Sequence, residues 1–199
     1  MTRIIAGFAG SLSLAVPRSG TRPTSDRVRE AIFSALEARG GLGGTRVLDL
    51  YAGSGALGLE AASRGAATVT LVEKNAAAAR IARQNAGVIE KAFQKAARSA
   101  APDARPRIGV SVAAVQSYLR AQPVVPGAGF DVVLIDPPYD LPDEELAEAL
   151  AAVTPLLAPD AVVLVERSSR SPEPTWPAGL ELDRSKSYGE TVLWWASPA

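Results

Sequence analysis

From residue 47 onward the sequence alternates between short apolar segments and longer segments with helical periodicity. The segments with strand character are 47–51, 68–72, 108–112, 130–135, 161–165, 180–187 and 190–195. Those with helix character are 56–64, 75–97, a short stretch that ends near 121, and 143–157. Strands that alternate with helices join by right-handed crossovers into a parallel sheet covered on both faces. We therefore expect a Rossmann-like α/β fold with a mostly parallel seven-stranded sheet.

The first part of the chain has a different character. Residues 1–23 are rich in Gly, Ser, Pro and Arg and contain short apolar pairs, which predicts a small β-hairpin arm. Residues 24–26 then supply the side chains that begin a helix, and an amphipathic stretch continues to the glycine run at 40–44. We accordingly expect two parts, an N-terminal arm (1–23) and a main domain (24–199).

The absence of two residue types limits the reactions that this chain can catalyse. The 199 residues include no cysteine and no histidine, which excludes disulfides, thiolate metal sites and a histidine general base. We expect no metal site, so the chemistry falls to carboxylates, hydroxyls, backbone groups and a bound cofactor. No apolar run is long enough to span a bilayer, and the N-terminus lacks the apolar core of a signal peptide. We expect a cytoplasmic protein without a membrane partner.

In a parallel sheet, ligands bind at the carboxyl ends of the strands. The first strand ends in the segment L-D-L-Y-A-G-S-G-A-L-G (48–58), whose G-x-G-x-x-G pattern allows a tight turn and close approach of a ligand. The glycines alone suit NAD as well as S-adenosylmethionine. The carboxylate of Asp49 favours a ligand with an amino group, because it would repel a pyrophosphate. The predicted cofactor-binding residues here are Asp49, Tyr51, Gly53, Ser54, Gly55 and Gly58.

An acidic residue also follows the second predicted strand. Glu73 lies fifteen residues past Gly58, a place from which a carboxylate can accept both hydroxyls of an adenosine ribose. Taken alone, Glu73 could equally be a solvent-exposed acid before a helix. Because the glycine turn precedes it, we assign Glu73 and the adjacent Lys74 to the cofactor site.

The fourth predicted strand ends in I-D-P-P-Y (135–139). Two prolines fix the backbone and remove two N–H donors, which leaves carbonyl acceptors beside the Asp136 carboxylate. A carboxylate and a carbonyl together can accept both hydrogens of an aromatic amino group and turn its lone pair toward a methyl donor. The candidate catalytic residues are Asp136, Pro137, Pro138 and Tyr139, the last as a flat face for a base. The alternative is a turn that only ends a strand.

At these residues the chain resembles class I methyltransferases that act on amino nitrogens, and more narrowly the RsmD family. Three segments resemble the RsmD family in particular: R-I-I-A-G (3–7), T-R-P-T-S-D-R-V-R-E-A-I-F (21–33) and Y-G-E-T (188–191). Together with the motifs above, they extend the resemblance over nearly the whole chain. It implies S-adenosylmethionine as cofactor and N2 of a guanine in 16S ribosomal RNA as target. It further implies a partner in the assembling small ribosomal subunit.

The net charge of zero argues against binding nucleic acid by bulk charge alone. Through residue 30, however, the chain carries five arginines against two acids. We expect RNA contacts at Arg3, Arg18, Arg22, Arg27 and Arg29, and we expect Thr24 to close over the cofactor. Two segments depart from the family pattern. The arm has G-S-L-S-L (10–14) where basic residues are usual, and V-A-A-V-Q (112–116) offers no assigned side chain for the adenine.

Other functions share parts of these motifs. The D-P-P-Y signature also occurs in enzymes that methylate adenine or cytosine amino groups of DNA, and a protein amide is a further possible target. An NAD-dependent dehydrogenase would explain the glycine turn but not the Asp-Pro-Pro-Tyr segment. A non-catalytic RNA-binding protein that keeps the fold is the remaining alternative.

Overall fold

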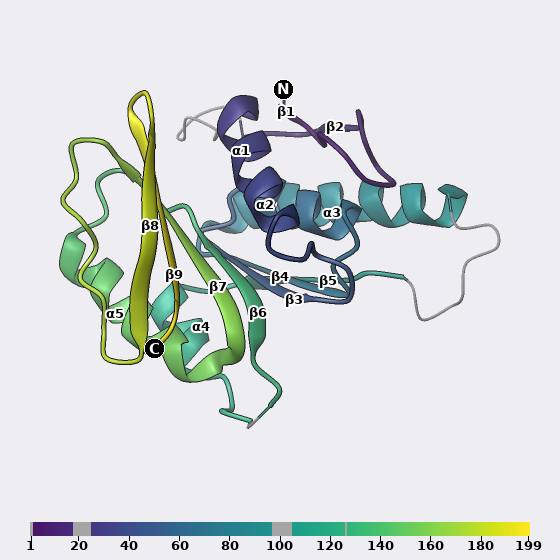
Figure 1. Cartoon of the computed structure of the whole chain (residues 1–199). Helices are drawn as coiled ribbons and strands as arrows, with labels where there is room; N and C mark the ends of the chain where they lie inside the picture. Colours follow the sequence, from purple (N-terminus) through teal and green to yellow (C-terminus); the bar gives the residue numbers. More distant parts are fainter. Residues whose placement is uncertain (1, 18–24, 97–104, 126) are drawn as a thin grey trace.

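The computed structural model describes residues 2–17, 25–96, 105–125 and 127–199, and a twisted sheet forms its centre (Figure 1). The seven strands are β3 (Arg46–Leu50), β4 (Thr68–Glu73), β5 (Arg107–Val112), β6 (Phe130–Ile135), β7 (Leu157–Ser168), β8 (Leu180–Tyr188) and β9 (Thr191–Pro198). Their order in the sheet is β5-β4-β3-β6-β7-β9-β8. The first five are parallel, whereas β9 runs antiparallel to β7 and β8. The predicted seven-stranded, mostly parallel α/β fold is confirmed.

Helices cover both faces of this sheet. One face is covered by α1 (Asp26–Glu37), α2 (Ala56–Ser63) and α3 (Ala76–Ala96), and the other by α4 (Val115–Arg120) and α5 (Asp143–Val153). Alternate residues of a strand enter different cores: Val47 packs with the first group of helices, and Leu48 and Leu50 with the second. Burial on both faces explains why the central parallel strands β3 and β6 are mostly apolar. In the part of the chain that the structure describes, no helix is long and apolar enough to cross a membrane.

The predicted N-terminal hairpin is present and packs against the helices. It consists of β1 (Thr2–Arg3) and β2 (Ser13–Leu14), paired antiparallel. Ile4 and Leu14 are buried in the same core as α1, α2 and α3. The hairpin therefore contributes to the core of the main domain. The predicted division of the chain at residue 23 falls in 18–24, outside the described residues, and stays a prediction.

The connection from α5 to β7 differs from the prediction of one helix over 143–157. Helix α5 ends at Val153, and a short 3-10 turn (Thr154–Leu156) leads into β7, which begins at residue 157 and not at 161. Pro155 has no N–H and cannot continue an α-helix, and Leu157 already pairs with Phe130 of β6. Proline and strand pairing together outweigh the helical periodicity.

Helix α2 lies unusually close to the sheet at Gly58. A Cβ atom on this residue would be 2.3 Å from Leu71 Cδ2 and 2.9 Å from Val69 Cγ1, both on β4. Such distances are shorter than van der Waals contact, so only glycine allows the helix to approach this closely. The third glycine of the G-x-G-x-x-G pattern is thus required by helix–strand packing.

We expect Gly58→Ala to lower the free energy of unfolding by about 1–3 kcal/mol, because the added methyl group overpacks the contact with β4. Gly87 in α3 is a matched control, since no atom lies within 4 Å of a Cβ added there. Gly87→Ala should instead stabilise the protein by about 0.5–1 kcal/mol through helix propensity. Urea denaturation measures both. Equal stability of Gly58→Ala and the wild type would contradict the packing argument.

Candidate active site

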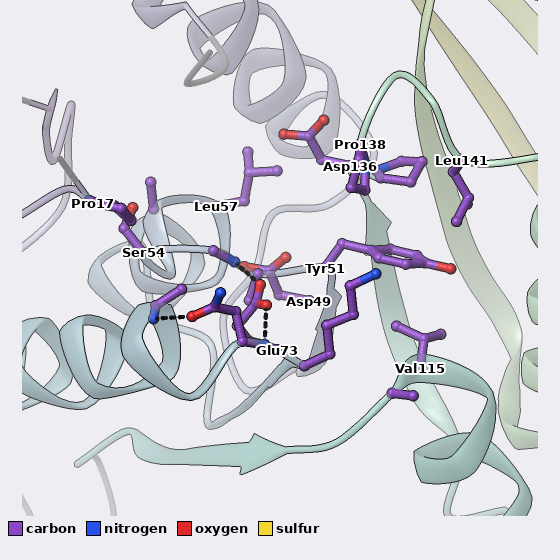
Figure 2. A pocket seen from close by; sticks show the side chains of 18 of the residues that line it. Pro17, Asp49, Tyr51, Ser54, Leu57, Glu73, Val115, Asp136, Pro138 and Leu141 are labelled. Carbon is purple, nitrogen blue, oxygen red and sulfur yellow. Dashed lines mark hydrogen bonds between the residues drawn. The ribbon is translucent and has the colours of Figure 1, made fainter. Parts of the chain in front are cut away.

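A cavity of about 1010 Å³ opens at the carboxyl ends of β3, β4 and β6 (Figure 2). This is the point where the strand order reverses, because the chain runs from β3 to β4 and β5 on one side and returns to β6 on the other. Predicted residues from all three strand ends line it: Asp49, Tyr51, Gly53, Ser54, Glu73, Lys74, Asp136, Pro137, Pro138 and Tyr139. The fold therefore brings the candidate cofactor site and the candidate catalytic segment into one cavity.

The other predicted cofactor residues have different places. Gly55 caps α2 with φ of 81°, a left-handed conformation that favours glycine, and Gly58 lies in the first turn of that helix. Neither residue lines the cavity, so both shape the turn without facing a ligand there. Thr24 lies outside the described residues.

Asp49 is the most deeply buried acid of the cavity. Its side chain is 1% exposed, and Oδ2 accepts a hydrogen bond of 2.8 Å from the backbone N–H of Gly58. Burial is the main cause that raises the pKa of Asp49 to about 8; the nearby charges of Asp136 and Glu73 add to the shift, and the bond from Gly58 opposes it. Asp49 lies close to Glu73 and Asp136 at this cavity, so a positively charged ligand bound there would favour the ionised form of Asp49.

Glu73 connects the end of β4 to the glycine turn. Its Oε2 accepts from the Gly53 N–H at 2.9 Å, and its Oε1 accepts from the Asn75 N–H at 2.7 Å (Figure 2). Each carboxylate oxygen can accept more than one hydrogen bond. Glu73 can therefore hold the turn in place and still accept hydroxyl groups of a ligand.

Tyr51 has a strained backbone at the start of the turn. Its φ is 62°, which is rare for an aromatic residue. Burial is the main cause that raises the pKa of the Tyr51 hydroxyl to about 12, so the group stays protonated at neutral pH. The strained conformation is held by the surrounding fold and places the side chain on the cavity wall (Figure 2).

The Asp-Pro-Pro-Tyr segment leaves β6 and forms one side of the cavity. Its loop is closed by the Leu141 N–H, which donates to the Pro138 carbonyl at 2.9 Å. Arg167, 3% exposed at the end of β7, donates through Nη2 to the Leu141 carbonyl at 3.0 Å and to Asp143 Oδ1 at 2.8 Å. Arg167 thereby fixes the loop to the sheet. No sequence pattern indicates this role, because Arg167 resembles an ordinary charge at the end of a strand.

Tyr139 is 49% exposed at the cavity, in contrast to the buried ring expected of a core aromatic. An exposed ring beside an opening is free to stack on a flat ligand. The geometry is consistent with the predicted role as a face for a base.

Several segments line the cavity that no motif indicated, among them residues 16–17, 114–116 and the first turns of α3 and α5. Val16 and Pro17 follow the N-terminal hairpin, and Figure 2 shows Pro17 on the side of the cavity away from Asp136. Residues 114–116 follow β5, the position where the sequence offered no assigned side chain for adenine. In the part of the chain that the structure describes, no group of three or more acidic side chains is arranged to hold a metal ion.

The predicted RNA-binding arginines divide into three groups. Arg3 and Arg27 are exposed, and Arg3 Nε lies 3.7 Å from Asp26 Oδ2. Arg18 and Arg22 lie outside the described residues. The prediction for Arg29 is wrong, because its side chain is fully buried. Its Nη2 donates to the Arg3 carbonyl and to Asp26 Oδ1, both at 2.7 Å, so Arg29 joins the hairpin to α1 and presents no charge to a phosphate.

Comparison with known proteins gives consistent matches over nearly the whole chain. Residues 2–197 match a family model described as "Conserved hypothetical protein 95". The chain is 34% identical to Ribosomal RNA small subunit methyltransferase D of Escherichia coli strain K12, over 96% of this chain and 86% of that protein. It is 30% identical to Putative rRNA methyltransferase YlbH of Bacillus subtilis, over 95% of each chain. The solved structure of the putative methyltransferase yhhF from Escherichia coli superposes with a TM-score of 0.77 at 31% identity, covering 98% and 97% of the two chains.

The raised pKa of Asp49 predicts a pH dependence of stability. Between its ordinary pKa of 3.8 and its folded pKa of about 8, the folded state holds a proton that the unfolded chain has released. This contribution is fully present below pH 4 and is lost as pH rises toward 8, at up to about 1.4 kcal/mol per pH unit. Asp49→Asn removes it, so urea unfolding at pH 5 and pH 8 should show a smaller difference in the variant. Identical pH dependence in both proteins would argue against a protonated Asp49.

Proposed function

This chain belongs to the family described as conserved hypothetical protein 95, the RsmD family, and from that premise we propose that it methylates N2 of a guanine in 16S ribosomal RNA, with S-adenosylmethionine as the methyl donor. One observation carries the proposal: the Asp-Pro-Pro-Tyr segment and the acidic cofactor turn line the same cavity. An NAD-dependent dehydrogenase has no use for that segment. The names of the relatives support ribosomal RNA as the substrate class, and the resemblance to the family supports guanine N2.

The residues of the cavity fit S-adenosylmethionine. A bound cation favours the ionised form of Asp49, which would then hold the positively charged amino group of the methionine part, and Glu73 would accept the hydroxyls of the ribose. The Gly53–Gly55 turn lets the ligand approach the backbone, and residues 114–116 would lie against the adenine. When bound, the cofactor supplies a methyl group made electrophilic by a positively charged sulfur. The acidic side chains stabilise that charge.

The target guanine would leave its stack and enter the cavity beside Tyr139, as enzymes that act on bases require. The Asp136 carboxylate and the Pro137 carbonyl would accept the two hydrogens of N2, which directs the nitrogen lone pair toward the methyl group. The nitrogen–methyl bond forms as the sulfur–methyl bond breaks. Alignment of this kind lowers barriers by up to about 7–11 kcal/mol. The methylated nitrogen then releases a proton to Asp136 or to water, so no histidine is needed.

The enzyme would bind ribosomal RNA within an assembling small subunit, and it would therefore act in the cytoplasm. Arg3 in β1 and Arg27 in α1 are exposed and available for this contact. Arg18 and Arg22, which lie outside the described residues, stay predicted RNA contacts from the sequence. Their contacts would be to phosphates, which position the RNA without reading its sequence.

The methylated nucleoside identifies the base that the enzyme modifies, and variants of Asp136 test the proposed transfer mechanism. Mass spectrometry of nucleosides from unmodified small subunits, treated with the protein and labelled cofactor, should show N2-methylguanosine. Asp136→Ala should bind S-adenosylmethionine normally but lose about 10²–10³-fold in transfer, as when one transition-state hydrogen-bond partner is removed. Asp136→Asn should be milder, because its amide oxygen still accepts one hydrogen.

Asp160→Ala is the control, because Asp160 is an exposed acid near the start of β7 and should leave turnover unchanged. Tyr139→Phe should keep much of the activity and Tyr139→Ala should lose it, since stacking is worth about 1–3 kcal/mol per base. N6-methyladenine or a methylated protein amide as product would reject guanine as target. Full turnover by Asp136→Ala would reject the mechanism.

Glu73 tests the placement of the cofactor. Glu73→Ala should weaken S-adenosylmethionine binding by about 100-fold or more, since two hydrogen bonds to a charged acceptor are lost and each is worth about 1.5–3 kcal/mol. Glu181→Ala, which removes an exposed acid on β8, should bind normally. Titration calorimetry gives both affinities, and circular dichroism checks the fold. An unchanged affinity in Glu73→Ala places the ribose elsewhere.

Arg27 tests the RNA surface. Arg27→Ala should weaken binding to small subunits and reduce the slope of log K against log salt by about one, as for a lost phosphate contact. Arg120→Ala on α4, across the sheet, is the matched control and should change neither value. Filter binding across a salt series measures the slope. If Arg27→Ala and Arg120→Ala behave alike, the RNA does not contact α1 at this residue.

A further inference from the structure

One buried amide in α3 connects the N-terminal hairpin to the glycine turn. Asn85 is 1% exposed. Its Oδ1 accepts from the Ala15 N–H, and its Nδ2 donates to the Ala15 carbonyl, both at 2.9 Å. The same Nδ2 donates to the Ser54 carbonyl, also at 2.9 Å. A single side chain therefore joins two segments that are distant in the sequence.

Both segments held by Asn85 belong to the wall of the cavity. Ser54 lines it directly, and Ala15 is followed by Val16 and Pro17, which also line it. Figure 2 shows Pro17 and Ser54 on the same side of the cavity. A shift of the glycine turn would either break the hydrogen bond between Ser54 and the Asn85 side chain or move that side chain. If the side chain moved, its two hydrogen bonds to Ala15 would move Ala15 with it.

The rest of the hairpin is held by α2, the helix that begins where the glycine turn ends. Glu60 Oε2 and Oε1 accept from the Ile5 and Ala6 N–H groups at 2.6 and 3.0 Å. Ser63 Oγ accepts from the Ala9 N–H at 3.0 Å and donates to the Ala6 carbonyl at 2.6 Å. These anchors hold the hairpin as a body, so its position follows that of the turn and of α2.

We propose that Asn85 is a positioning residue that couples cofactor binding to RNA binding. The inference rests on the proposed function, in which the glycine turn holds S-adenosylmethionine and the hairpin contacts ribosomal RNA. A cofactor that orders the turn also fixes the Ser54 carbonyl, and through Asn85 it fixes residues 15–17 and the hairpin. RNA then binds a hairpin that is already placed. By thermodynamic linkage, bound RNA strengthens cofactor binding by the same factor.

The coupling is measured as a ratio of two affinities. The dissociation constant for unmodified small ribosomal subunits is determined with and without saturating S-adenosylhomocysteine, which occupies the cofactor site without reacting. We expect the wild type to bind subunits at least about 5-fold more tightly with the ligand, within the usual range of coupling between sites. In Asn85→Ala the ratio should fall to about one, because the amide bridge is lost.

Two further variants separate the bridge from general packing. Asn85→Leu keeps about the size of the side chain but can neither donate to the Ser54 carbonyl nor accept from the Ala15 N–H, so its ratio should also fall. Ser63→Ala removes hairpin bonds without touching the bridge, so it should weaken subunit binding and keep the ratio. Thermal melting confirms that each variant is folded.

The outcomes distinguish this inference from the function on which it rests. If the wild type binds and methylates subunits with a ratio of one, the coupling is rejected and the proposed function stands. If both folded Asn85 variants keep the wild-type ratio, the role of Asn85 is rejected. If the wild type neither binds nor methylates subunits, the proposed function itself fails, and the coupling fails with it.

Discussion

The close approach of α2 to β4 at Gly58 is the contact on which the site depends. It lets the Gly58 N–H reach the buried carboxylate of Asp49, which fixes the helix against the end of β3. The helix in turn fixes the glycine turn before it, and the Gly53 N–H of that turn donates to Glu73 at the end of β4. Two strands, one helix and one turn are held by a few short hydrogen bonds, and the cavity opens above them.

The acidic side chains of Asp49, Asp136 and Glu73 lie close together at this cavity, and this proximity has an electrostatic cost. Asp49 is buried near Asp136 and Glu73, and burial together with their negative charges raises its pKa. Ionisation of Asp49 would add a further negative charge beside Asp136 and Glu73, whereas a cationic ligand would offset that repulsion. The same arrangement therefore opposes pyrophosphate ligands and favours a ligand with ammonium and sulfonium groups. This preference is the electrostatic basis for assigning S-adenosylmethionine in the proposed function.

Buried polar side chains make the N-terminal hairpin part of the main domain. Arg29 joins it to α1, Glu60 and Ser63 join it to α2, and Asn85 joins it to α3. Removing one partner of such a bond leaves a buried group without its hydrogen bond, which costs more than the bond itself contributes. The hairpin is consequently joined to the helices and the turn beside the cavity, so its position depends on theirs. A surface that is to present RNA to an active site benefits from this connection, because alignment and not acid–base chemistry is the main demand of the proposed reaction.

The sequence alone determined the fold class, most strand and helix positions, and the residues at the strand ends. These depend on local periodicity, and the carboxyl ends of parallel strands must converge, so Asp49, Glu73 and Asp136 could be placed together in advance. Only the tertiary structure decided that Arg29 is buried, that residues 16 and 17 line the cavity, that Arg167 holds the Asp-Pro-Pro-Tyr loop, and that Asn85 bridges two segments. Each of these facts depends on partners 24 to 70 residues away in the chain, as in the bonds from Arg167 to Asp143 and between Asn85 and Ala15. Local sequence patterns hold no information about such contacts, because the packing of whole elements creates them.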